Sequence, residues 1–213
     1  MSEQALTIAL SKGRILDETL RLLAAAGLPQ PEGLQSRKLI LQSSCGTIRY
    51  VLAKPVDVPT YVEHGVADIG IAGKDVLVEA GRDLYELLDL GIGRCKMAVA
   101  GLPERMAGEP MQKVASKYPR IAAEFFRGRG QQAEVICMNG SVELAPLIGL
   151  AECIVDVVET GRTLRENGLV VQAEVMEIST RLVANRMSFR LKYKAIDLLV
   201  RNLQAVVVKG AAV

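Results

Sequence analysis

The chain has 213 residues, half of them hydrophobic, and its 26 basic and 24 acidic side chains give a net charge of +2. This length allows one large domain or two smaller lobes, and the near balance of charge argues against a nucleic-acid or membrane surface. Tryptophan is absent and other aromatic residues are few, so the core must consist of valine, leucine, isoleucine and alanine, as in α/β proteins with strands buried on both faces.

Cysteine usage and the N-terminal segment indicate a cytoplasmic protein. The four cysteines are Cys45, Cys95, Cys137 and Cys153. They form no CxxC pair, and a single histidine accompanies them, which argues against a zinc site and favours reduced, mostly buried thiols. The segment MSEQALTIALSKGR has no basic stretch followed by a long apolar run, so it predicts no signal peptide. No apolar window is long enough to span a membrane.

The chain opens with an apolar strand, a basic turn and an amphipathic helix. The strand is expected at residues 5–10 and the helix at 15–26, where leucines share one face before Gly27 ends it. Lys12 and Arg14 lie at the helix start, where cations oppose the helix dipole unless they serve an anionic ligand. A solvated basic turn is the alternative interpretation.

Strands and helices then alternate up to residue 92. The expected elements are strands at 39–41 and 47–53, a helix at 57–65, a strand at 67–73 and a helix that opens at Lys74 and Asp75. Arg49 lies inside the second of these strands. Gly70 and Gly73 remove side chains from the third strand, which either permits close helix packing or lets a ligand lie on the strand end.

The second half repeats this alternation. The expected elements are strands at 94–100, 114–116, 135–138, 153–158, 170–178 and 181–184, and helices at 119–127, 141–149, 164–168 and 188–206. The pattern predicts a doubly wound α/β fold with mainly parallel sheets and helices on both faces. Because it breaks near 91–93 and 178–180, we expect two lobes, residues 1–92 with 179–213 and residues 93–178.

The stretch Ile154–Leu164, IVDVVETGRTL, is the most informative part of the sequence. An apolar β-branched run ends in a polar turn around Gly161, and a short helix follows. A strand, a glycine turn and a helix N-terminus form the usual phosphate-binding arrangement, because glycine admits an anion close to the backbone and the first helical amides have no partner within the helix. Thr160 and Thr163 add hydroxyl donors.

The charges around this turn favour a phosphorylated sugar. Arg162 can supply a cation, whereas the carboxylates of Asp156 and Glu159 would repel phosphate. The carboxylates fit a ligand that also carries sugar hydroxyls or a bound magnesium ion. A threonine-capped turn without a ligand is the alternative that the local pattern leaves open.

A longer pattern that overlaps this turn resembles the signature of the ATP phosphoribosyltransferase family. The pattern is Glu143-x5-Gly149-x-Ala151-x2-Ile154-x-Asp156-Val157-x2-Thr160-Gly161-x-Thr163-Leu164. The stretches LTIALSKGRILDETLRLLAAAGL, DVPTYVEHGVADIGIAGKDVL, LGIGRCKMAVA, KYPRIAAEFF and NGSVELAPLIGL resemble further blocks of that family. The resemblance covers nearly the whole chain.

The resemblance implies a two-lobed periplasmic-binding-protein type II fold and a specific reaction. A phosphoribosyl group passes from phosphoribosyl pyrophosphate (PRPP) to N1 of ATP, with magnesium required, in the first step of histidine biosynthesis. The chain stops at Val213, so it resembles the short form without the C-terminal regulatory domain. Short-form enzymes work with a subunit similar to histidyl-tRNA synthetase, so we expect homodimers of this chain within a hetero-oligomer, a hetero-octamer.

Together with the loop chemistry, the resemblance assigns three groups of residues. PRPP is expected to bind Asp156, Glu159, Thr160, Gly161, Arg162, Thr163 and Leu164. The catalytic cations, which neutralise pyrophosphate or the ATP triphosphate, are expected to be Lys12, Arg14 and Arg49. The ATP side of the cleft is expected to include Ser11, Gly13, Asp68, Gly70, Gly73, Asp75, Arg94 and Glu143. No protein side chain is assigned as a metal ligand, because substrate phosphates are expected to hold most of the magnesium coordination.

Three other functions compete with this interpretation. A non-catalytic small-molecule-binding protein could share the same two-lobed fold. A nucleic-acid-binding or scaffolding protein is disfavoured by the balanced charge and scarce aromatic residues. A phosphoribosyltransferase acting on another base is compatible with the same loop chemistry, and only the family resemblance selects ATP.

Overall fold

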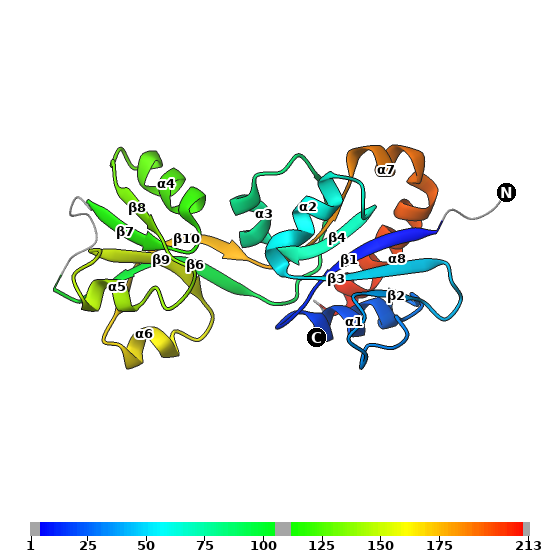
Figure 1. The fold of residues 1–213 in the computed structure, drawn as a ribbon, viewed down its shortest axis with the longest axis horizontal. Helices are drawn as coiled ribbons and strands as arrows, with labels where there is room; N and C mark the ends of the chain where they lie inside the picture. The colour runs from blue at the N-terminus through cyan, green and yellow to red at the C-terminus, as the bar shows by residue number, and fades with distance from the viewer. Residues whose placement is uncertain (1–4, 105–111, 211–213) are drawn as a thin grey trace. The chain divides into compact units, whose positions relative to one another are not determined.

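Figure 1 shows the chain as a computed structural model that describes residues 5–104 and 112–210. The chain divides into two compact units, Met1–Gly93 with Ser179–Val213, and Arg94–Ile178. It therefore passes out of the first unit after Gly93 and returns to it at Ser179. Residues 1–4, which belong to the segment that predicted no signal peptide, lie outside the described residues.

The first unit is a six-stranded sheet with helices on both faces. Its elements are β1 (Leu6–Ser11), α1 (Leu16–Ala25), β2 (Ile40–Gln42), β3 (Ile48–Ala53), the 3-10 helix η1 (Pro55–Asp57), α2 (Val58–Glu63), β4 (Ile69–Gly73), α3 (Lys74–Ala80), β5 (Tyr85–Asp89), β11 (Thr180–Ala184), α7 (Arg186–Leu191) and α8 (Tyr193–Gly210). The strand order is β2-β3-β1-β4-β11-β5. Strand β1 is parallel to β3 and β4, so these three strands end at the same edge.

Alternating side chains of β1 enter two separate cores. Leu6, Ile8 and Leu10 belong to a cluster that includes α1 and α8, whereas Ala9 belongs to a cluster that includes α2. This follows from the two-residue period of a strand, which sends successive side chains to opposite faces. On the α2 side, Gly70 is necessary because a Cβ there would lie 2.6 Å from a methyl group of Val62. The glycine therefore allows α2 to pack closely on β4.

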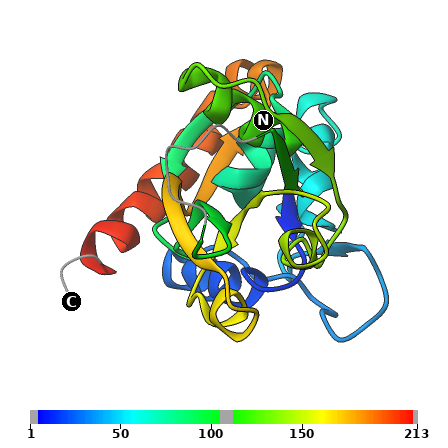
Figure 2. The same ribbon diagram turned by 90° about the vertical axis from the view of Figure 1, so that its left-hand side faces the viewer.

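The second unit is a five-stranded sheet in the order β10-β6-β9-β7-β8. Its elements are β6 (Cys95–Gly101), β7 (Lys113–Ser116), α4 (Pro119–Gly128), β8 (Glu134–Cys137), α5 (Leu144–Leu147), β9 (Cys153–Val158), α6 (Arg162–Glu166) and β10 (Val170–Ile178). Helix α4 lies on one side of this sheet, and α5 and α6 lie on the other, as Figure 2 shows. Strand β7 is parallel to β8 and β9, so the loops after these three strands share an edge.

Both sheets are mixed, which corrects the expectation of mainly parallel sheets. Strands β6 and β10 pair antiparallel with each other, and β6 also pairs antiparallel with β9. In the first unit, β11 is antiparallel to β4 and β5, and β2 is antiparallel to β3. Strands β2 and β3 form a hairpin. The other antiparallel pairs involve the strands next to the two segments that connect the units (β5, β6, β10 and β11), because the chain reverses direction there instead of returning through a helix.

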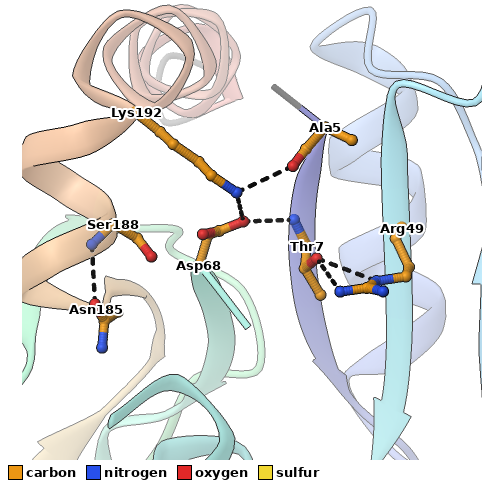
Figure 3. Close-up of polar contacts among 7 residues, drawn as sticks. All are labelled: Ala5, Thr7, Arg49, Asp68, Asn185, Ser188 and Lys192. Carbon is orange, nitrogen blue, oxygen red and sulfur yellow. Dashed lines mark hydrogen bonds and ion pairs between the residues drawn. The ribbon is translucent and has the colours of Figure 1, made fainter. Parts of the chain in front are cut away.

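The C-terminal helix predicted at 188–206 is two helices, α7 and α8, that meet at Lys192. Asn185 begins α7, where its side-chain oxygen accepts hydrogen bonds from the amides of Met187 and Ser188 at 2.9 Å, the second of which is drawn in Figure 3. Lys192 interrupts the helical conformation and points its ammonium at the buried carboxylate of Asp68, 2.7 Å away. A buried charge needs such a partner, so the break has a long-range cause.

The cysteines correct a second expectation. Cys153 is buried, but Cys45 and Cys137 are exposed, so the thiols are not mostly buried. A hydrogen bond of 2.9 Å between Cys45 Sγ and the Thr47 hydroxyl lowers the pKa of the Cys45 thiol below its ordinary value. All four cysteines are free. Among residues 5–104 and 112–210, no helix combines the length and the hydropathy needed to cross a bilayer.

Candidate functional site

The turn between β9 and α6 has the geometry of an anion-binding loop. Gly161 adopts φ 67° and ψ 12°, the left-handed conformation that glycine tolerates best. Glu159, Thr160 and Thr163 are exposed around it, while Leu164 is buried against the second unit's core and holds the helix in place. The Arg162 amide donates to the Thr160 hydroxyl at 3.4 Å, and the amides that follow it have no partner within the helix, so the turn presents them beside two hydroxyl groups.

Two arginines flank this turn, and only one of them was predicted. Arg162 pairs with Glu166 at 2.7 Å, an exposed pair within one helix that contributes at most a few tenths of a kcal/mol, about 0.3–0.5. Arg165 reaches back over the turn and donates a hydrogen bond of 3.0 Å to the Thr160 carbonyl oxygen. Its position four residues after Gly161 puts it on the same helical face as the turn, a spacing that could have identified it.

Other predicted residues of the second unit lie at the same sheet edge. Lys96 is opposite Val158 in the antiparallel pairing of β6 with β9, so Arg94, two residues earlier, is placed beside the start of the turn. Glu143 follows β8, and both β8 and β9 are parallel to β7. It directly precedes α5 and makes no side-chain capping hydrogen bond there. The register thus gathers Arg94, Glu143 and the glycine turn at one edge.

Ser141 is a feature that the sequence did not reveal. It has φ 49°, and among the described residues it is the non-glycine residue with positive φ. Such a conformation is uncommon outside glycine, asparagine and aspartate, and strained residues gather at functional sites. Ser141 lies in the loop after β8, at the same edge as the glycine turn.

The basic turn after β1 is exposed at the carboxyl edge of the first sheet. The Lys12 amide donates to the Ala53 carbonyl oxygen at 2.8 Å, which fixes the turn beside the end of β3. Gly13 has φ 94°, and the side chains of Lys12 and Arg14 are exposed. The Arg14 guanidinium lies 3.5 Å from the Gly93 carbonyl oxygen. The two predicted cations therefore lie together, next to the first passage of the chain.

Two residues predicted near this turn have structural contacts. Ser11 is buried and its hydroxyl donates to the Ile71 carbonyl oxygen at 2.9 Å, so it joins β1 to β4 and does not face a ligand. Gly73 ends β4 at the same edge, and a Cβ on it would collide with the carboxylate of Asp75. Gly73 and Asp75 thus remain at the predicted edge, where the start of α3 folds back over the strand end.

Asp68 and Arg49 lie at the opposite edge of the first sheet from the basic turn, so the structure does not bring them together with Lys12 and Arg14. Asp68 precedes β4, is 5% exposed, and accepts hydrogen bonds from the Thr7 amide at 2.9 Å and from the Lys192 ammonium at 2.7 Å. Arg49 is paired in register with Thr7 and donates to its hydroxyl through Nε and Nη2, at 3.2 and 3.0 Å. Figure 3 shows these contacts.

The length of the strands decides how far these residues are from the basic turn. Ala53 is paired with Ser11, just before the basic turn, and Arg49 is four residues before Ala53. Because a strand rises about 3.3 Å per residue, the backbones of Arg49 and Ala53 are about 13 Å apart. Asp68 is five residues before Gly73, about 16 Å by the same measure. The structure therefore places Arg49 and Asp68 on Thr7, and it does not bring either of them into contact with Lys12 or Arg14.

Comparison with known proteins gives one consistent result. A sequence model described as ATP phosphoribosyltransferase matches residues 54–205. An ATP phosphoribosyltransferase of Geobacillus sp. (strain WCH70) is 55% identical over 204 residues, 95% of this chain and 98% of that protein. The enzyme of the same name from Bacillus licheniformis is also 55% identical, over 95% of each chain.

Solved structures agree with the sequence comparison. The ATP phosphoribosyl transferase (HisG:HisZ) complex from Thermotoga maritima includes a chain with TM-score 0.83 and 34% identity, covering 96% of this chain and 99% of that chain. The periplasmic VFT2 domain of BvgS from Bordetella pertussis has TM-score 0.54 at 15% identity over 97% of this chain and 93% of that chain. At that identity the second match concerns the fold alone, which is similar to that of a periplasmic binding domain.

Proposed function

The chain belongs to the ATP phosphoribosyltransferase family, and we propose that its two units divide the substrates of that reaction between them. The reaction is a pentosyl transfer to ATP, the first step of histidine biosynthesis. The observation that supports the division is the pair of exposed turns. One surrounds Gly161 in the second unit, and the other holds Lys12 and Arg14 in the first.

In this proposal the turn after β9 holds the 5′-phosphate of PRPP. The amides around Gly161 and the hydroxyls of Thr160 and Thr163 donate to phosphate oxygens, and hydrogen bonds to a charged group are stronger than those between neutral groups. Arg165 braces the turn from the helix behind it through its bond to Thr160. The carboxylates of Asp156 and Glu159 accept hydrogen bonds from the ribose hydroxyls.

Lys12 and Arg14 act on the leaving group. As the bond from the anomeric carbon to pyrophosphate breaks and the bond to N1 of ATP forms, the transition state carries positive charge on the sugar and negative charge on the departing phosphates. Fixed cations at that position stabilise the transition state more than the ground state. Adenine N1 carries no proton that must be removed before it attacks, so catalysis depends on alignment and charge.

The residues near the phosphate turn are compatible with magnesium. In residues 5–104 and 112–210, no three or more histidine, cysteine, aspartate or glutamate side chains are grouped to hold a metal ion. Magnesium needs no such cage, since it commonly binds one or two carboxylates together with substrate phosphates. Asp156, which is half-buried, and the exposed Glu159 could supply those carboxylates. The ion would neutralise charge on the pyrophosphate.

A regulatory partner and a cytoplasmic location complete the proposal. The Thermotoga maritima structure is a HisG:HisZ complex, which supports a regulatory partner subunit for this chain. We propose that this partner is similar to histidyl-tRNA synthetase and that the assembly is a hetero-octamer built on homodimers of this chain. Four free cysteines suit a reducing compartment, which supports a cytoplasmic location.

Incubation with ATP, PRPP and magnesium tests the proposed function. We expect phosphoribosyl-ATP to form, detected by its nucleotide absorbance, and pyrophosphate to be released in equal amount. A solute-binding protein of the same fold would bind a ligand and release no pyrophosphate. The assay is repeated with the partner subunit and with increasing histidine. If the product forms but histidine has no effect in the presence of the subunit, the regulatory part of the proposal is wrong and the catalytic part stands.

We propose that Arg49 acts from a second copy of the chain, which would bring its guanidinium to the basic turn. On that basis we expect Arg49→Glu to abolish turnover and Lys12→Ala to reduce it about a hundredfold, and a mixture of the two variants to recover activity, because a mixed dimer contains one complete site. Exchange of subunits is checked by native mass spectrometry. Normal turnover by Arg49→Glu alone would remove this residue from the reaction, and an inactive mixture of exchanged subunits would remove the second copy.

A further inference from the structure

Asp89 joins the two segments through which the chain leaves and re-enters the first unit. It is the last residue of β5, and its Oδ1 accepts a hydrogen bond of 2.9 Å from the Gly91 amide, just before the chain leaves. The same oxygen accepts a hydrogen bond of 2.8 Å from the hydroxyl of Ser179, the first residue after the return. One carboxylate oxygen therefore holds both segments that connect the two units, at Gly91 and at Ser179; these segments are called the passages below.

The other oxygen of Asp89 belongs to an ion network. Arg181 is paired with Asp89 in register, and its Nη1 lies 3.1 Å from Asp89 Oδ2 and 3.3 Å from Glu86 Oε1. The ammonium of Lys74 lies 2.6 Å from Glu86 Oε2. Charges that form a connected network hold geometry better than an isolated exposed pair. This network extends from the first residue of α3 across β5 to β11.

Both passages are attached to the edge of the first sheet that carries the basic turn. The Lys74 amide, which opens α3 after the end of β4, donates to the Ser179 carbonyl oxygen at 2.9 Å. On the other side, the Gly93 amide donates to the Glu18 carboxylate at 3.0 Å, and the Gly93 carbonyl oxygen lies 3.5 Å from Arg14 Nη2. A shift of either passage would therefore move the edge of the sheet that carries the catalytic cations.

We propose that Asp89 is a positioning residue for phosphoribosyl transfer, which holds both passages of the chain in register with the basic turn. This inference rests on the proposed division of the substrates between the two units. If PRPP is held on one unit and the leaving-group cations are on the other, their alignment depends on the segments that connect the units. A misplacement of about 1 Å can reduce a rate about a hundredfold.

Asp89→Asn tests the proposal because it removes the charge that pairs with Arg181 and sets an amide donor against that guanidinium, which displaces the side chain whose Oδ1 holds both passages. We expect kcat at saturating substrates to fall at least about tenfold. The dissociation constant for PRPP alone, measured by isothermal titration, should stay unchanged, because the glycine turn lies in the other unit. A purely structural role would not separate kcat from PRPP affinity in this way.

The matched control is Asp83→Asn. Asp83 lies just before β5, as Asp89 lies at its end, and it pairs with Arg186 at 2.7 Å, but it contacts neither passage. We expect this variant to keep the kcat of the unmodified chain. Equal values of kcat in the two variants, or loss of PRPP affinity in Asp89→Asn, would overturn the proposal.

A milder variant decides the question if Asp89→Asn does not fold. Ser179→Ala removes one hydroxyl from the passage, and Ser179→Thr retains it. We expect kcat to fall in the first and to recover in the second, and an unchanged kcat in Ser179→Ala would overturn the proposal. The proposed division of the substrates is tested separately, by measuring the affinity of glycine-turn variants for PRPP. The proposal for Asp89 is tested by kcat, so the two proposals can fail independently.

Discussion

Replacing Gly161 and Thr163 together by alanine is expected to lower PRPP affinity about a hundredfold while the chain remains folded. The double variant removes a hydroxyl donor and disturbs the amides of the turn, and two hydrogen bonds to a charged phosphate at about 1.5 kcal/mol each correspond to that factor. Gly161 has φ 67°, and a Cβ there would lie 3.2 Å from Arg165 Nη1, so the change also displaces the arginine that braces Thr160. Isothermal titration with PRPP measures the effect.

The control for this variant lies at the other end of the same helix. Gly168 follows α6 and has φ 68°, almost the same backbone conformation as Gly161, but a Cβ on it would meet no atom within 4 Å. Alanine at either position costs about 1–2 kcal/mol of backbone strain. Gly168→Ala should therefore match the loss of thermal stability and keep PRPP affinity. If both glycine variants bind PRPP equally well, the turn is not the phosphate site.

The sequence predicted the local elements because their signals are local. The apolar run of β9, the glycine after it and the buried Leu164 suffice to predict a strand, a turn and a helix start, and the structure has them there. The basic turn after β1 was predicted in the same way. Both turns lie at the carboxyl edges of parallel strands, where the strand directions bring neighbouring loops together.

The errors concern features that depend on pairing between distant segments. Arg49 and Asp68 lie in stretches of the expected type, but only the register of β1 with its neighbours shows that both meet Thr7 at the opposite edge. The break at Lys192 contains neither proline nor glycine and is explained by the buried carboxylate 124 residues away. No periodicity in the sequence carries that information.

Lys12→Ala is expected to reduce kcat/KM about a hundredfold, an effect as large as the one expected on PRPP affinity for the glycine turn. The Lys12 side chain is exposed, and within residues 5–104 and 112–210 its ammonium makes no ion pair, so its loss should cost the fold little. A charged hydrogen bond to the departing pyrophosphate contributes about 1.5–3 kcal/mol, and about 2.7 kcal/mol corresponds to a hundredfold change. Steady-state kinetics with both substrates measures the effect.

Two companions distinguish a role at the leaving group from a general effect of positive charge. Lys12→Arg keeps the cation on the same turn and should retain more activity than the alanine variant, although a guanidinium does not reproduce the compact charge of an ammonium. Lys194→Ala removes an exposed lysine from α8 with the same change in net charge and should leave kcat/KM unaltered. If the two alanine variants lose activity equally, the loss reflects net charge, and the basic turn has no specific part in catalysis.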